Sequence, residues 1–172
     1  MKTEVTITYL EMDHPKAFRP SSGKVPNLEC RRVDPPDPEI NRYFYSTVGR
    51  DWFWIDRLVW TEQQWRDWSD RPELETWIGY LNDEQVGYFE LEHQPDENIE
   101  IAHFGLLPDH IGKGLGGALL MLAIKRAWEA GAKRVWLHSC TLDHPFALNN
   151  YQARGMRIFK METQIKDVPG RI

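Results

Sequence analysis

The stretch Ile111-Gly112-Lys113-Gly114-Leu115-Gly116-Gly117 decides the fold, because it joins a segment typical of a strand to one typical of a helix. Residues 99–107 before it favour a strand. In residues 115–130 after it, apolar side chains recur at helical spacing, and Gly131 ends the pattern. This stretch favours a phosphate or pyrophosphate site, because small residues let an anion approach the backbone, Lys113 adds a positive charge, and the helix start leaves amides free. A tight turn that binds nothing is the alternative.

The elements around this stretch predict a mixed sheet. Residues 75–81 and 85–92 are strand-like runs joined by polar residues, which predicts a hairpin. Downstream, the pattern predicts a strand at 134–140, a helix at 145–154 and a last strand at 155–163. Two strands joined by a helix pair in parallel through a right-handed crossover. We therefore expect an α/β (α+β) fold with a mixed, mostly antiparallel sheet.

The first seventy residues predict fewer regular elements. Alternation at residues 5–9 is typical of a strand with one buried face. Six prolines within residues 13–38 leave room for only a short strand near 28–33. Pro38 stands at a favoured first helical position, which predicts a helix over 39–48. Thr61 and Gln64 form a capping box, which predicts a second helix over 62–68.

Composition limits the class of protein. A chain of 172 residues, of which 41% are hydrophobic, suits one compact domain over 1–172. The net charge of −5 and the lack of a run of Lys and Arg argue against a nucleic-acid partner. The longest apolar stretch, 118–124, is far shorter than the ~20 residues of a membrane span, so no membrane partner is expected. Two distant cysteines, Cys30 and Cys140, and no leader pattern at the N-terminus favour a cytoplasmic location. A homodimer is compatible with these features.

The type of phosphate ligand can be narrowed by elimination. A nucleoside-triphosphate loop needs Ser or Thr after its lysine, but Lys113 is followed by Gly114. A dinucleotide site follows the first strand of a parallel sheet, and an acidic residue stands about 20 residues further on. Here the glycines follow antiparallel strands, and Glu129 falls within the helix. No spacing of Cys and His fits a zinc site, so no metal is predicted.

Two segments resemble the GNAT superfamily of N-acetyltransferases. Residues 111–116 match its signature Gln/Arg-x-x-Gly-x-Gly/Ala, with Ile111 at the first position. Residues 147–156 match its Ala-x-x-x-Tyr-x-x-x-Gly-Phe segment, with Met156 in place of Phe. The resemblance implies the GNAT fold, with roughly six to seven strands and about four helices, and acetyl-CoA as donor to an amine. It covers residues 73–163, and residues 10–70 would form the variable acceptor-binding region.

The resemblance also implies which residues bind the cofactor. Backbone groups of Phe104, Gly105 and Leu106 would contact the pantetheine arm. His144 stands where many members carry an asparagine that contacts the cofactor. The pyrophosphate would lie on the loop and helix start formed by Ile111, Gly112, Lys113, Gly114, Leu115, Gly116 and Gly117.

Glu100 is the first candidate for a general base. An amine must lose a proton to attack a thioester, and a carboxylate or imidazole can accept it directly or through water. Glu100 stands eleven residues before Ile111, the spacing at which the histone-acetyltransferase branch of the family places its catalytic glutamate. His103 is the rival base, and three residues on it faces the opposite side of an ideal strand. Alternatively, Glu100 is only one member of a solvated acidic cluster.

Tyr151 is the candidate general acid. It resembles the family tyrosine that protonates the departing thiolate, and a phenol carries its proton at neutral pH. A packing role is the alternative. A thiol mechanism through Cys140 with His138 or His144 is less favoured, since members of the family generally transfer the acyl group directly.

Residues 40–77 are predicted to build the acceptor site. They hold six of the eight tryptophans, and Asp51-Trp52-Phe53-Trp54-Ile55-Asp56 alternates acids with rings, as a cation-binding pocket would. The same rings would equally serve as a core layer.

The predicted function is transfer of an acetyl group from acetyl-CoA to a primary amine by direct attack. A noncatalytic acyl-CoA-binding or sensing domain of the same fold would keep the glycine loop and Tyr151 but show no turnover. A peptide-interaction module built on the tryptophans would lack affinity for coenzyme A.

Overall fold

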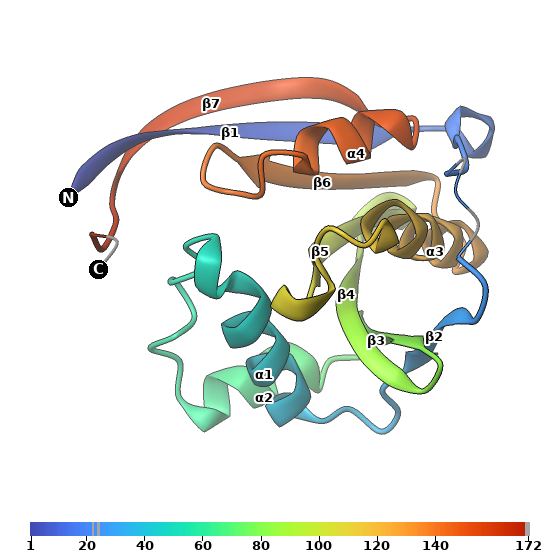
Figure 1. The fold of residues 1–172 in the computed structure, drawn as a ribbon, viewed down its shortest axis with the longest axis horizontal. Coiled ribbons are helices and arrows are strands. Elements are labelled where there is room, and N and C mark those ends of the chain that lie inside the picture. The colour runs from blue at the N-terminus through green and yellow to red at the C-terminus, as the bar shows by residue number, and fades with distance from the viewer. Residues whose placement is uncertain (22, 24, 171–172) are drawn as a thin grey trace.

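The structure, a computed structural model, describes residues 1–21, 23 and 25–170. Within these residues one seven-stranded sheet has the order β2-β3-β4-β5-β6-β1-β7 (Figure 1). The strands are β1 (Lys2–Met12), β2 (Leu28–Arg32), β3 (Leu74–Leu81), β4 (Glu84–Gln94), β5 (Asn98–Leu106), β6 (Arg134–Cys140) and β7 (Arg157–Asp167). The α-helices are α1 (Pro38–Val48), α2 (Glu62–Ser69), α3 (Leu115–Glu129) and α4 (Ala147–Ala153).

The predicted fold class is confirmed, and the local signals act as expected. Helix α1 begins at Pro38, and the Asp37 side chain accepts a hydrogen bond from the Glu39 amide at 3.1 Å. In α2 the capping box of Thr61 and Gln64 is present in both directions. Helix α4 is shorter than predicted, because a turn occupies the residues before Ala147.

Strands β5 and β6 are the parallel pair, joined by α3, and the other ladders are antiparallel. The parallel ladder holds only Asn98–Glu100 against Arg134–Trp136. Beyond these positions the described residues of β5 and β6 form no ladder with each other. The two strands therefore part as they approach the glycine loop.

Two hydrophobic clusters cover opposite faces of the sheet. Helices α1 and α2 lie on one side of β3–β5 and α3 lies on the other (Figure 1). The larger cluster packs α3 against the sheet and includes Phe89, Leu91, Leu119, Ile124 and Leu137. The smaller cluster packs α1 against the sheet and consists of Phe44, Val48, Ile78 and Tyr88.

An extra residue in β5 overturns the expected orientation of His103. Glu90 pairs with His103, but the next residue of β4, Leu91, pairs with Ile101, so Ala102 is inserted without a partner. Such a β-bulge shifts the alternation of side chains by one position. Ile101 therefore packs on the α3 side, while His103 joins Glu100 on the α1 side. The prediction that the two residues face opposite sides was wrong, because an ideal strand was assumed.

No helix in the described part of the chain is both long enough and apolar enough to cross a membrane.

Candidate active site

The glycine loop has the backbone that the sequence predicts for anion binding. Gly112 and Gly114 have φ of 82° and 74°, and an added Cβ on either would meet open space. Gly114 is the N-cap of α3, and no side chain in the described part of the chain caps the first turn. Lys113 is exposed beside them. Glycine adopts these positive φ values without strain, so the first amides of α3 stay open to an anion.

Arg154 and Asn150 adjoin this loop, although no sequence motif assigned them to it. A Cβ on Gly117 would lie 3.1 Å from Arg154 Nη1 and 3.5 Å from Asn150 Oδ1. The Nε atom of Arg154 is buried and has no hydrogen-bond partner among the described residues. The only available signal is position, since Arg154 follows Tyr151 by one helical turn. A second cation therefore accompanies Lys113 at the loop.

The end of β5 leads directly to this loop. Leu106 Cδ1 lies 3.9 Å from the Cβ position of Gly116, and Phe104 and Leu106 pack against the larger cluster. A Cβ on Gly105 would lie 2.3 Å from Val48 Cγ1, so glycine permits the close approach of α1. Leu115 is buried in the first turn of α3. The predicted pantetheine residues and the predicted pyrophosphate loop thus lie together.

Tyr151 is buried beside the same strand end. Its ring packs edge-on against Phe104 with 6.3 Å between centroids, and the side chain belongs to the larger cluster. Burial raises the pKa of its phenol above the ordinary value, and Asp143 and Cys140 add to the rise. The hydroxyl therefore keeps its proton at neutral pH.

Glu100 lies where β5 and β6 part, and 14% of its side chain is exposed. Gln94 Nε2 donates a hydrogen bond to Oε2 at 2.9 Å, and His138 Nε2 lies 3.8 Å from Oε1. Burial raises the pKa of Glu100 to about 7, and the neighbouring Glu92 carboxylate adds to the rise. This carboxyl group is half protonated near neutrality, which suits a general base.

Two further glutamates share this face of the sheet, and each accepts two side-chain hydrogen bonds. Glu92 accepts hydrogen bonds from Arg71 at 2.7 Å and Gln94 at 2.8 Å. Glu90 is fully buried and accepts from Trp68 at 2.7 Å and from Asn41 at 3.2 Å.

The pKa of Glu90 is lowered, because His103, Trp68 and Arg57 outweigh the effect of burial, which alone would raise it. Glu90 therefore stays ionised, and its Oε2 lies 3.6 Å from His103 Nδ1. Tyr45, Trp54 and Trp68 pack around the His103 ring.

Cys140 is the last residue of β6, and His144 lies in the loop that follows it. His144 packs edge-on against Trp52 with 4.9 Å between centroids, and its Nδ1 accepts a hydrogen bond from the Phe146 amide at 3.1 Å. Burial raises the pKa of the Cys140 thiol, and Asp143 adds to the rise. A protonated thiol is a poor nucleophile, which disfavours the thiol mechanism.

The tryptophan-rich segment contributes both to the core and to the site. Trp65 is fully buried, whereas Trp52 and Trp54 are half-buried. The Arg57 guanidinium lies over the faces of Trp60 and Trp68, with its Cζ 4.4 Å and 4.0 Å from their centroids. The chain's own cation therefore occupies these rings.

A sequence model of the acetyltransferase (GNAT) family matches residues 39–156. The chain belongs to this family. No curated protein matches it in sequence.

Solved structures resemble this GNAT chain at low identity. A GCN5-related N-acetyltransferase from Kribbella flavida has a TM-score of 0.67 and 18% identity, covering 99% of this chain and 61% of that one. A functionally unknown protein from Staphylococcus epidermidis has a TM-score of 0.64 and 15% identity, with 95% and 62% covered. A Bacillus subtilis acetyltransferase in complex with CoA has a TM-score of 0.58 and 20% identity, with 77% and 78% covered. The GNAT chain thus spans about three fifths of the first two proteins.

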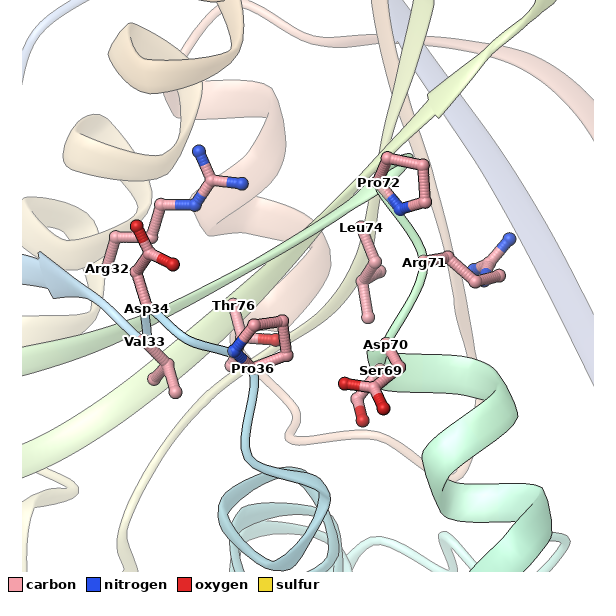
Figure 2. A pocket seen from close by; sticks show the side chains of 10 residues that line it. All are labelled: Arg32, Val33, Asp34, Pro36, Ser69, Asp70, Arg71, Pro72, Leu74 and Thr76. Carbon is pink, nitrogen blue, oxygen red and sulfur yellow. The ribbon is translucent and has the colours of Figure 1, made fainter.

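A pocket of 270 Å³ lies away from the glycine loop, between the end of α2 and the edge of the sheet (Figure 2). Figure 2 shows Arg32 and Asp34 from β2 and the loop after it, and Ser69 and Asp70 from the end of α2. Its lining residues belong to the predicted acceptor-binding region and not to the predicted cofactor-binding loop.

Replacing Glu100 with Gln is expected to stabilise the fold in a pH-dependent way. The folded-state pKa of Glu100 lies above its ordinary value of 4.5, so its ionisation costs stability as pH rises from about 4.5 to about 7. Glutamine avoids that cost. Thermal unfolding should show a higher Tm for Glu100→Gln at pH 8.5 and little change at pH 4.5. The exposed Glu73→Gln is the control, and an equal change at both pH values would contradict the raised pKa.

Proposed function

We propose that this chain transfers an acetyl group from acetyl-CoA to a primary amine by direct attack. One observation carries the proposal: Glu100, a mostly buried carboxyl group with a pKa of about 7, lies on the strand that leads to an open helix N-terminus. The carboxyl group suits deprotonation of an amine at neutral pH, and the helix start suits a pyrophosphate.

The residues present fit acetyl-CoA as the donor. Open space above Gly112 and Gly114 leaves room for phosphates. Lys113 lies between these glycines, and Arg154 lies beside Gly117. Acetyl-CoA would supply a thioester whose carbonyl carbon accepts the amine. The loop residues would hold its phosphates, and β5 would hold the pantetheine arm.

Protons balance through Glu100 and Tyr151. The amine arrives as an ammonium ion, and Glu100 accepts one proton from it. The nitrogen then forms a bond to the carbonyl carbon, and the carbon–sulfur bond breaks. Tyr151 donates a proton to the thiolate and recovers one from the nitrogen. Each turnover therefore leaves one proton on Glu100, which must reach solvent.

His103 is the second candidate for the base, because the bulge brings it to the face of Glu100. Its Nδ1 lies beside the ionised Glu90, and aromatic rings surround it. This environment suits a role in holding the acidic face together. Glu100 is therefore the preferred base.

Gly116 tests the donor site with a matched pair of variants. A Cβ there would lie at ordinary distances of 3.7 Å from Asn150 Nδ2 and 3.9 Å from Leu106 Cδ1, so Gly116→Ala should fold and bind acetyl-CoA. Gly116→Glu places a negative charge against the pyrophosphate, and binding should weaken on the order of a hundredfold. Calorimetric titration measures both. Equal binding by the two variants would place the donor elsewhere.

The pH profile of turnover tests the base, once a screen of amines for coenzyme A release has found an acceptor. The kcat/KM of the wild type should rise with pH and level off near 7, because Glu100 must be ionised. Glu100→Gln should be slower by about 10² or more at pH 7 and should keep rising toward the pKa of the amine itself. If its profile levels off at the same pH as the wild type, another group is the base. If acetyl-CoA binds but no amine reacts, the chain is a noncatalytic acyl-CoA-binding domain.

Tyr151→Phe tests the acid while keeping the ring in its packing. Turnover should fall by about 10² to 10⁴, with unchanged affinity for acetyl-CoA. Tyr88→Phe is the matched control, since Tyr88 is also buried and its hydroxyl has no hydrogen-bond partner in the described residues. Similar rates for the two variants, with the chemical step limiting, would reduce Tyr151 to a packing residue.

A further inference from the structure

A buried base needs a way to lose its proton. Under the proposed function, one proton remains on Glu100 after each turnover, yet only 14% of its side chain is exposed. The groups that contact Glu100 therefore decide how the base returns to its ionised form. The inference below rests on the proposed function.

His138 is the titratable group placed to receive this proton. It lies on β6, and its Nε2 is 3.8 Å from Oε1 of Glu100. The other oxygen, Oε2, accepts the hydrogen bond from Gln94, which cannot carry a proton away. Half of the His138 side chain, 50%, is exposed, so the ring connects a buried carboxyl group to solvent.

The other titratable groups on this face are less suited to the task. Both oxygens of Glu92 already accept hydrogen bonds, from Gln94 and Arg71. His103 is only 14% exposed and packs among aromatic rings beside the ionised Glu90. In the described ranges, His138 is the imidazole that combines closeness to Glu100 with broad exposure.

The surroundings of His138 keep it neutral and hold its ring in place. Burial lowers its pKa, and His103 of β5 and Lys166 of β7 lower it further, while Asp143 in the loop after β6 acts in the opposite sense. A neutral imidazole at pH 7 can accept a proton. The Tyr9 ring of β1 packs against it with 5.6 Å between centroids.

We propose that His138 relays the proton of Glu100 to solvent. The proton leaves Oε1 and binds Nε2, through one bridging water or after a small approach of the two side chains. The ring then releases a proton from Nδ1 to water, and Glu100 is ionised again. The step involves no oxidation or reduction. His138 acts through Glu100 and does not touch the substrate.

Chemical rescue of two His138 variants tests the relay. His138→Gln keeps the size and polarity of the side chain but cannot carry a proton, and His138→Ala leaves room for added imidazole. In dilute buffer both should lower kcat by about tenfold or more, with unchanged affinity for acetyl-CoA. Imidazole should restore the His138→Ala rate in proportion to its unprotonated concentration. The solvent deuterium isotope effect on kcat should rise in both variants.

The control is His93→Gln, because His93 is a partly exposed histidine that contacts Glu75 outside this site. It should keep the wild-type rate and show no response to imidazole. Thermal unfolding and acetyl-CoA binding verify that each variant is folded.

The outcomes separate the relay from the proposed function. If the wild type acetylates no amine in the screen, the proposed function fails. If the wild type is active but His138→Gln matches its rate, the relay is wrong. A slow, folded His138→Ala that imidazole does not rescue, with an unchanged isotope effect, would also overturn the relay and leave His138 a positional role.

Discussion

The one-residue bulge at Ala102 is the constraint on which the rest of the site depends. It lets Ile101 stay in the core against α3 while Glu100 and His103 both face the α1 side. With regular alternation, His103 would point into the larger cluster, and burial of an unpaired polar ring there would be costly. The bulge therefore gives β5 an apolar face and an acidic, histidine-bearing face within a few residues.

The distribution of hydrogen-bond donors explains why one carboxyl group of three has a strongly raised pKa. Glu90 has two donors and the nearby His103, and Glu92 has Arg71 and Gln94. Within the residues that the structure describes, Glu100 has only the shared Gln94 amide and a histidine beyond hydrogen-bond distance. Desolvation is therefore outweighed at the first two groups and only partly compensated at the third. Because Glu90 and Glu92 have more donors and nearby cations than Glu100, the proton affinity is highest at Glu100.

Local signals predicted most of the fold, because caps, glycines and periodicity act over a few residues. The capping box at Thr61 and the helix after Gly114 are examples. The bulge has no such signal, since a strand with one extra residue and a regular strand give similar patterns over residues 99–106. The approach of His138 to Glu100 depends on how β5 and β6 part, which is a tertiary property. Motifs were therefore enough to nominate the site residues. Their electrostatic partners could be identified only from the structure.

The tryptophan-rich segment illustrates how one composition serves two purposes. Alternating acids and rings at residues 51–56 suggested a pocket for an external cation. Further along the segment, the rings of Trp60 and Trp68 hold the guanidinium of Arg57. Its positive charge lowers the pKa of Glu90 and Glu92 and opposes the rise at Glu100. Trp60 and Trp68 thus hold the positive charge of Arg57 near the acidic face. This charge limits how far the pKa of Glu100, the proposed base, rises. Arg57 already partly balances the negative charge of the face that an acceptor amine would meet. Selection of the amine would therefore depend on the half-buried rings of Trp52 and Trp54.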